Sequence, residues 1–287
     1  MSLVWFITGA SNGLGLSMAL QALQAGHKVI AAMRNPERSA AASRTIEEAG
    51  GSVFQLDTTE SQEAIVSKME RAEAVYGQID VLVNNAGYSV LGACEDFSEE
   101  EITTLFRTNV FGPMFITQGV LPGMRARRTG TIVNLSSVAG QDGSPACGLY
   151  SASKFGLEGY SESLSREVGE FGISVLIVEP GAFRTNFLAA MQVTGRGVGG
   201  SFRGGGSVVA QALDMYRAAN GKQVGDPEKA VARIVDVVTG RGDAGELKGK
   251  VLRLVLGRDA HTRIVNKTDK LREDLEASKL VAYSTDM

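Results

Sequence analysis

Short runs of consecutive apolar residues alternate with longer stretches in which apolar residues recur every three or four positions. The first run, Leu3–Ile7, is followed by glycines and then by a helical pattern over residues 14–25. Further apolar runs, which predict strands, lie at residues 29–33, 53–56, 81–83, 131–135, 173–178 and 251–256; helices are predicted at 37–49, 64–76, 99–121, 149–170 and 227–238. Because the runs are continuously apolar, both faces of each strand are expected to be covered. The pattern predicts an α/β fold with a doubly wound, seven-stranded parallel sheet flanked by helices.

No linker or shift of composition divides this pattern, so we expect a single domain over residues 1–257. The chain then continues as a charged, helix-prone segment, which we expect to form a C-terminal helical extension over residues 258–287. The one biased segment is Gly195–Gly206, in which seven of twelve residues are glycine.

The charge balance and the few sulfur and imidazole ligands disfavour several classes of protein. The 287 residues carry 29 Lys+Arg and 32 Asp+Glu, a net charge of −3, whereas binding to nucleic acid or an anionic membrane needs a basic surplus. Two cysteines and two histidines form neither a disulfide framework nor a metal-ligand spacing, so no metal is expected. The N-terminal apolar run is shorter than the ~7–15 residues of a signal-peptide core, and we expect a cytoplasmic protein.

A glycine-rich turn, Thr8-Gly9-Ala10-Ser11-Asn12-Gly13-Leu14-Gly15, separates the first predicted strand from the first predicted helix. Gly9 would form the tight turn, and Gly13 and Gly15 would let the backbone approach a pyrophosphate bound at the helix N-terminus. The spacing is GxxxGxG rather than the standard GxGxxG, and a turn without a ligand is the alternative. The strand–turn–helix context favours a dinucleotide.

The end of the second predicted strand indicates which dinucleotide binds. About 20 residues beyond the loop, where an acidic residue would hold the ribose of NAD, the chain has Met33 and Arg34. The Arg34 guanidinium would bind the 2′-phosphate of NADP(H) through its charge and its N–H donors. We therefore expect NADP(H); the alternative is that Arg34 is an ordinary solvated arginine.

A second group of residues has acid–base chemistry. Tyr150 and Lys154 are four residues apart at the start of a predicted helix and share a face. A nearby ammonium would lower the Tyr150 pKa from ~10, so that the phenol could give or take a proton near neutral pH. Ser137 follows a predicted strand, where its hydroxyl would hold a carbonyl or alcohol. A helix-surface pair and a serine that caps the strand end are the alternatives.

These motifs together resemble the short-chain dehydrogenase/reductase family, of the ordinary non-extended type, over residues 3 to about 257. The matching pieces, in order, are TGASNGLG at 8–15, Asp57, NNAG at 84–87, Asn109, NLSS at 134–137, YSASK at 150–154 and PGAFRT at 180–185. The resemblance implies a Rossmann fold and a catalytic tetrad of Asn109, Ser137, Tyr150 and Lys154.

The resemblance also implies the reaction: NADPH-dependent interconversion of a ketone or aldehyde and an alcohol by hydride transfer. Tyr150 would exchange the proton, Ser137 would orient the oxygen, Lys154 would lower the Tyr150 pKa and hold the nicotinamide ribose, and Asn109 would anchor a water. The further implied cofactor contacts are Ser11, Asn12, Leu14, Asp57, Asn85, Ala86, Gly87, Pro180, Gly181, Phe183 and Thr185. A cofactor-binding sensor without turnover is the alternative, which the complete tetrad disfavours.

The glycine-rich segment lies where the family has a substrate lid, which we expect over residues 186–220. With few apolar contacts to hold it shut, this lid would order over a medium-sized hydrophobic ketone or alcohol. The side chains expected to close over the substrate are Phe187, Met191 and Phe202. Arg196 and Arg203 argue instead for an anionic substrate.

We also expect a homodimer or homotetramer, joined through the predicted helices 99–121 and 149–170. The family commonly pairs these helices. Their apolar residues, expected at the interface, are Phe106, Val110, Phe111, Phe115 and Leu164.

Overall fold

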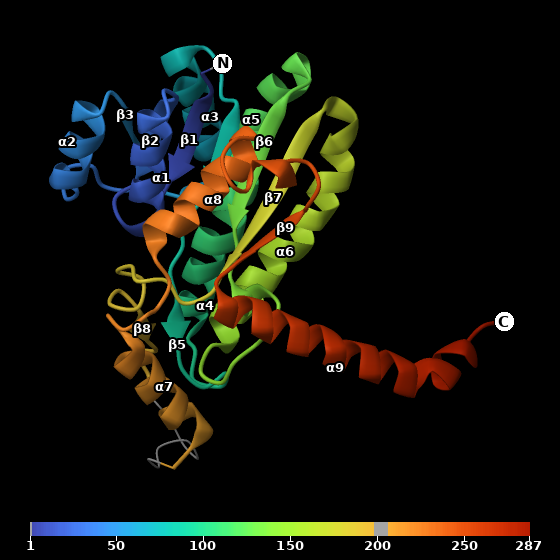
Figure 1. Cartoon of the computed structure of the whole chain (residues 1–287). Coiled ribbons are helices and arrows are strands. Elements are labelled where there is room, and N and C mark those ends of the chain that lie inside the picture. Colours follow the sequence, from blue (N-terminus) through green and yellow to red (C-terminus); the bar gives the residue numbers. More distant parts are fainter. Residues whose placement is uncertain (1, 198–205) are drawn as a thin grey trace.

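A computed structural model describes residues 2–197 and 206–287, in which a twisted parallel sheet is covered by helices on both faces (Figure 1). Its strands are β1 (Val4–Thr8), β2 (Lys28–Met33), β3 (Ser52–Gln55), β4 (Val81–Asn84), β6 (Gly130–Leu135), β7 (Ile173–Pro180) and β9 (Arg253–Leu256). They lie in the order β3-β2-β1-β4-β6-β7-β9, with every pair parallel. The predicted doubly wound, seven-stranded sheet is confirmed. The strand order reverses between β1 and β4, and such a switch point opens a crevice at the carboxyl ends of the strands.

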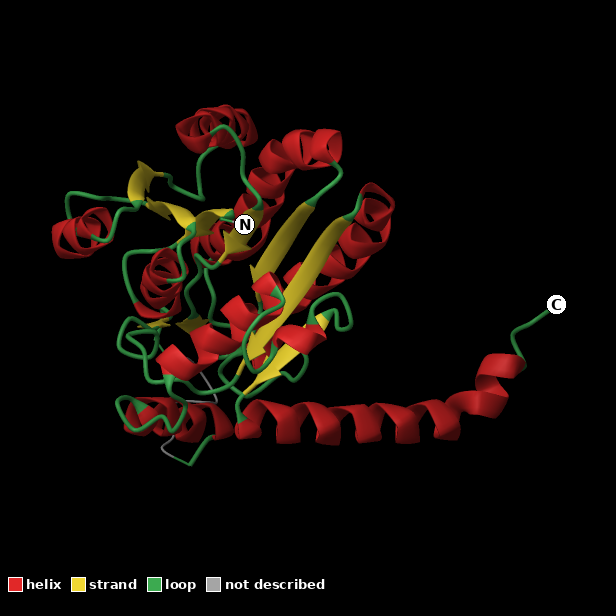
Figure 2. Cartoon of the chain, turned by 45° about the horizontal axis from the view of Figure 1, so that its top comes forward, coloured by secondary structure: helices red, strands yellow, loops and turns green. Residues whose placement is uncertain are grey.

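The helices form a layer on each face of the sheet (Figure 2). One layer holds α1 (Gly13–Gln24) and α8 (Pro227–Thr239), with α2 (Ala40–Glu48) at its margin; the other holds α3 (Gln62–Tyr76), α5 (Gly112–Arg127) and α6 (Gly148–Val168). In β1, Trp5 and Ile7 pack into the first layer, whereas Val4 and Phe6 pack into the second. Burial on both faces explains why the strands are continuously apolar in sequence.

The predicted helix over 99–121 is not one regular helix. It begins as α4 (Glu99–Phe106), which a capping box between Ser98 and Glu101 starts, and continues through a π-helical turn, η1 (Arg107–Phe111), into α5. The wider turn carries Asn109, whose side chain is completely buried. Turns of this kind occur often at functional sites, and the spacing of apolar residues does not distinguish them from α-helix.

The segment predicted as a weakly held lid is more ordered than the sequence suggested. Gln192–Val193 forms strand β8, which pairs with β5 (Val90–Leu91), and Val208–Ala219 forms helix α7. The α7 residues Val209 and Leu213 are buried in a cluster that includes Tyr150. The expectation of few apolar contacts is therefore wrong for α7, whose apolar residues recur at helical spacing. Phe202 and Arg203 lie outside the described residues.

The helices expected at an interface between subunits expose fewer apolar residues than predicted. Val110 and Leu164 are 4% exposed, because they pack inside their own subunit, and Phe106 and Phe115 are half-buried. Phe111 is 41% exposed, as predicted, and Phe155 on α6 is 45% exposed. The apolar surface on these helices is thus smaller than the sequence suggested.

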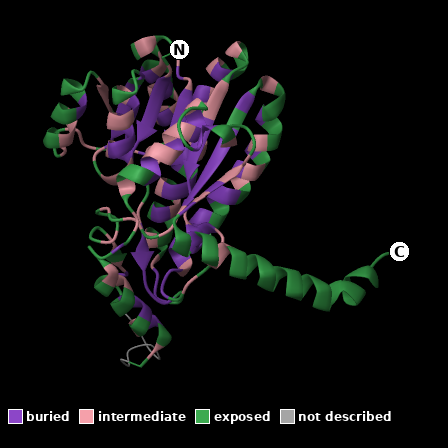
Figure 3. Ribbon diagram, viewed as in Figure 1, coloured by how far each residue is buried: buried purple, intermediate pink, exposed green. Residues whose placement is uncertain are grey.

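The chain ends in a long helix, α9 (Arg258–Tyr283), that extends away from the body (Figures 1 and 3). This helix, which is described in full, buries only Ala260. Its first turns are held by Asp259, which accepts from the Ala182 N–H at 2.8 Å, and by an ion pair of Arg263 with Asp142 at 2.8 Å. Over residues 2–197 and 206–287, none of the helices has the length and apolar character that crossing a membrane requires.

Candidate active site

The glycine-rich loop joins the end of β1 to the start of α1 at the switch point of the sheet. Gly9 and Gly13 have φ values of +65° and +54°, a region that favours glycine. A Cβ atom on Gly15 would overlap Asn85 Nδ2 and the Gly9 carbonyl, so only glycine fits there. Within the described residues, the Asn12 side chain makes no capping hydrogen bond to α1. The first N–H groups of this helix are therefore suited to an anion.

Thr8 is a positioning residue that the sequence reasoning did not single out. Its Oγ1 accepts hydrogen bonds from the backbone N–H groups of Asn85 and Ala86, both at 3.0 Å, and donates to the Val83 carbonyl at 3.3 Å. The Asn85 side chain donates in turn to the carbonyls of Thr8 and Gly9. The loops after β1 and β4 are thus fixed against each other. A hydroxyl at the last position of β1 was the available sequence signal.

Arg34 follows β2 and is exposed. In the described part of the chain its guanidinium has no ion-pair partner. Burial raises the pKa of Tyr88, which follows β4. The positive charge of Arg34 opposes that rise, so the guanidinium is close enough to Tyr88 to affect it electrostatically. Asp57, after β3, accepts from the N–H and hydroxyl of Thr59 at 2.9 and 2.8 Å.

Ser137, Tyr150 and Lys154 meet at the carboxyl edge of β6. A hydrogen bond joins the side chains of Ser137 and Tyr150, and Ser137 Oγ also accepts from the Ala139 N–H at 3.1 Å. Lys154 Nζ donates to the Leu135 carbonyl at 2.6 Å and lies 5.7 Å from the centre of the Tyr150 ring. The structure thus brings these three predicted residues together.

The pKa of Tyr150 departs from the prediction. Burial raises it above the ordinary value for a phenol, and the hydrogen bond with Ser137 opposes the rise. Burial lowers the pKa of Lys154 to about 8, an effect that the charge of Glu158 opposes. Lys154 is not among the groups that shift the Tyr150 pKa here, and its ammonium donates instead to the Leu135 carbonyl. That Lys154 lowers the Tyr150 pKa stays a prediction.

Asn109 joins the same group from the π-helical turn. Its Nδ2 donates to the Tyr88 carbonyl and to Ser153 Oγ, both at 3.0 Å, and its Oδ1 accepts from the Tyr88 N–H at 3.2 Å. A Cβ atom on Gly87 would lie 3.2 Å from Asn109 Oδ1 and 3.6 Å from Lys154 Nζ. Gly87 therefore lies where Asn109 and Lys154 approach each other.

The loop after β7 supplies the last group of predicted contacts. The methyl-bearing Cβ of Thr185 is 3.5 Å from the Cβ position of Gly13, so this loop closes against the glycine-rich one. Asp259 of α9 fixes it: a Cβ atom on Gly181 would overlap the Asp259 carboxylate. The Phe183 ring packs on Gly225 and the edge of the core. Sequence reasoning missed Asp259, which lies far away in the chain.

Tyr150 belongs to a buried apolar cluster next to Ser137. The other members are small and aliphatic side chains from β5, the loop before α6, and α7: Leu91, Ala93, Ala139, Ala146, Cys147, Val209, Ala212 and Leu213, with Met191, Val193 and Tyr216 partly buried against them. The Phe187 ring lies 5.6 Å from the Tyr150 ring. Tyr150 itself is 7% exposed, so α7 and Phe187 limit access to it.

Comparison with known proteins agrees with this fold and defines the family. The short chain dehydrogenase family model matches residues 3–194, and the chain belongs to this family, whose members are oxidoreductases. Oxidoreductase claN of Passalora fulva is 46% identical over 192 residues, which cover 66% of this chain and 86% of that protein. A 3-ketodihydrosphingosine reductase of Bacteroides thetaiotaomicron is 41% identical, over 63% of this chain and 64% of that enzyme.

Solved structures agree as well. A short-chain dehydrogenase from Streptomyces avermitilis superposes with a TM-score of 0.86 and 36% identity, over 99% of this chain and 98% of that chain. A metagenomic short-chain oxidoreductase in complex with NADP has a TM-score of 0.60 and 32% identity, over 64% of this chain and 85% of that chain. Proteins similar to this one thus bind nicotinamide cofactors.

Proposed function

We propose that this protein is an NADPH-dependent reductase of hydrophobic ketones or aldehydes, in which Tyr150 exchanges the proton. One observation carries the proposal: Tyr150 makes its hydrogen bond to Ser137 beside Lys154, within a buried apolar cluster. A sensor that only binds the cofactor would not need this hydrogen bond.

The residues at the switch point fit a nicotinamide dinucleotide. The N-terminus of α1 would hold the pyrophosphate between Ser11, Asn12 and Leu14, and Asp57, Asn85, Ala86 and Gly87 would line the adenosine half. Arg34 would bind the 2′-phosphate, which makes NADPH the preferred cofactor. Pro180, Gly181, Phe183 and Thr185 would line the nicotinamide end. Bound there, the cofactor would supply the hydride.

The protein's own groups would handle the proton and the carbonyl oxygen. Ser137 would donate a hydrogen bond to that oxygen, and Tyr150 Oη would deliver its proton as negative charge develops there. Burial raises the pKa of Tyr150, so the phenol is protonated at neutral pH, as an acid that delivers a proton must be. Lys154 would bind the nicotinamide ribose, and Asn109 would fix the backbone next to it.

The apolar cluster around Tyr150 supports a substrate class. Its side chains are mostly aliphatic or aromatic, and Arg196 is exposed and is not part of the cluster. A largely hydrophobic ketone would therefore bind better than a small anionic one. The relative named as a 3-ketodihydrosphingosine reductase supports a lipophilic ketone.

The experiment is NADPH consumption, followed at 340 nm, with a panel of ketones matched in size. The panel pairs aliphatic and aryl ketones with keto acids of similar length. The proposal predicts turnover that rises with the apolar surface of the ketone. Turnover of the keto acids alone would contradict the substrate class, and binding of NADPH without turnover of any ketone would favour the sensor.

A further inference from the structure

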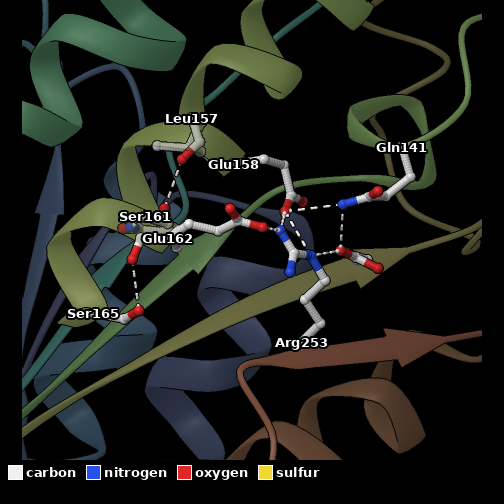
Figure 4. Close-up of polar contacts among 9 residues, drawn as sticks. Gln141, Leu157, Glu158, Ser161, Glu162, Ser165 and Arg253 are labelled. Atoms are coloured by element: carbon white, nitrogen blue, oxygen red, sulfur yellow. Dashed lines mark hydrogen bonds and ion pairs between the residues drawn. The ribbon is translucent and has the colours of Figure 1, made fainter. Parts of the chain in front are cut away.

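Around Arg253 lies a group of carboxylates, two of them buried, that the reaction as described does not use (Figure 4). Glu158 is on α6, one helical turn beyond Lys154, and Glu179 is in β7 directly before Pro180. Their side chains are 5% and 0% exposed. Arg253 of β9 pairs with both, with nitrogen–oxygen distances of 3.0 Å to each.

The group contains more acids than bases. Arg253 also pairs with Glu162 at 2.6 Å, so three carboxylates share one guanidinium. The Gln141 amide donates to Glu158 Oε2 and Glu179 Oε1, both at 3.1 Å, but adds no charge. Glu158 and Glu179 thus share the same two donors, and the other oxygen of each, Glu158 Oε1 and Glu179 Oε2, is buried with no hydrogen-bond partner among the described residues. Two buried carboxylates this close favour a proton on one of them. Burial and the neighbouring Glu158 raise the pKa of Glu179 to about 7. Its proton belongs to the pair rather than to one residue.

Glu158 lies near the end of β6, the same strand end that Lys154 contacts. Glu158 Oε1 and Ser136 Oγ are both buried and have no hydrogen-bond partner among the described residues. They lie 3.3 and 2.5 Å from the Cβ position of Gly140, so both border one small space. Ser136 adjoins Leu135, whose carbonyl binds Lys154 Nζ. The charge of Glu158 also opposes the effect of burial on the Lys154 pKa.

We propose that Glu158, together with Glu179, is a positioning residue for Lys154. The pair carries one negative charge while it shares a proton and two negative charges after it releases that proton. The second charge keeps the Lys154 ammonium protonated as the pH rises. The importance of that charge for turnover rests on the proposed function. The electrostatic coupling itself does not.

The direction of the effect follows from the order of the two titrations. The pKa of Glu179, raised to about 7, lies below that of Lys154, lowered to about 8, so the pair releases its proton at a lower pH than Lys154 does. The second negative charge then raises the Lys154 pKa. The other charged groups that face the pair are Arg253 and Glu162, and beyond Gln141 the ion pair of Asp142 with Arg263.

The test is an NMR titration of the full chain labelled with ¹³C at lysine Cε, in which the Lys154 signal is assigned from a Lys154→Arg variant. Glu158→Gln should lower the Lys154 pKa by about half a unit or more, because it removes the nearest opposite charge. Glu179→Gln should lower it by a smaller amount. The matched control is Glu162→Gln, which removes the 41% exposed carboxylate that pairs with the same arginine. This control should leave the Lys154 pKa unchanged. A Lys154 pKa in Glu158→Gln equal to that of the unaltered protein overturns the proposal.

A kinetic readout links the coupling to turnover. The alkaline limb of kcat/KM for ketone reduction should move to lower pH in Glu158→Gln by the same amount as the NMR titration, with the control unmoved. If no ketone is reduced, the proposed function fails while the NMR titration still decides this inference. If circular dichroism shows that Glu158→Gln is unfolded, Glu179→Gln decides it, and an unchanged Lys154 pKa there overturns the proposal.

Discussion

At the scale of single residues, the site depends on small side chains that fix backbone segments rather than on the reacting groups alone. Thr8 shows this most clearly, because its hydroxyl accepts from two N–H groups of the loop after β4. Thr8→Val keeps the shape but leaves both donors without an acceptor. We expect a loss of about 1–3 kcal/mol in the free energy of unfolding, measured by urea denaturation. Thr45→Val, on the exposed face of α2, is the control and should change stability little; equal effects of both would contradict the role given to Thr8.

Arg34 carries the proposed cofactor preference. Loss of a charge-assisted contact of ~1.5–3 kcal/mol would weaken NADPH binding about 10-fold to 100-fold in Arg34→Ala. NADH, which has no 2′-phosphate, should bind almost as before. Fluorescence titration of both cofactors checks this, with Arg38→Ala as the control from the same exposed loop. If Arg34→Ala weakens both cofactors alike, Arg34 does not select between them.

At the scale of elements, the sequence predicted what depends on local pattern. A few consecutive residues are enough to predict a strand buried on both faces, such as β1, or the glycine-rich loop from Thr8 to Gly15. The π-helical turn at Asn109 was not predictable, because it depends on bonds to Tyr88 and Ser153 from other segments. The ordered helix α7 was missed because the neighbouring glycines were given more weight than the apolar residues Val209 and Leu213.

Of the segment expected as a lid, helix α7 is the part for which we propose motion. It buries one face in the cluster around Tyr150, while Val208 and Met215 are 56% and 59% exposed. A helix packed on one side only, away from the main sheet, should open more often than the sheet-bound α6. We predict that amides of residues 209–219 exchange hydrogen faster than those of α6 with NADPH alone, and slow down when a ketone is added. Equal protection in both states would show that α7 does not move.

At the scale of the whole molecule, the question is which surface pairs with a second copy. Val110 of η1 packs against Gly156 of α6, with a methyl 3.9 Å from the Cβ position of that glycine. The exposed rings of Phe111 and Phe155 are the sequence neighbours of these two residues and therefore lie on adjacent parts of η1 and α6. A homo-oligomer would bury these two rings. We predict that Phe155→Asp shifts the protein to a monomer in light scattering at micromolar concentration.

The control for this prediction is Val224→Asp, at a residue 89% exposed elsewhere on the surface, which should leave the mass unchanged. A monomer before any substitution would contradict oligomerisation, and an oligomer that survives Phe155→Asp would place the interface elsewhere.

The central claim is that hydride moves from bound NADPH to a carbonyl carbon while Tyr150 supplies the proton. The most direct measurement uses NADPH in which both hydrogens at the nicotinamide C4 are deuterium, and mass spectrometry of the alcohol formed from a hydrophobic ketone. We expect one deuterium on the carbinol carbon with the unaltered protein. With Tyr150→Phe we expect almost no alcohol, although that variant still binds NADPH. Alcohol without deuterium, or undiminished deuterated alcohol from Tyr150→Phe, would show that the proposed reaction is wrong.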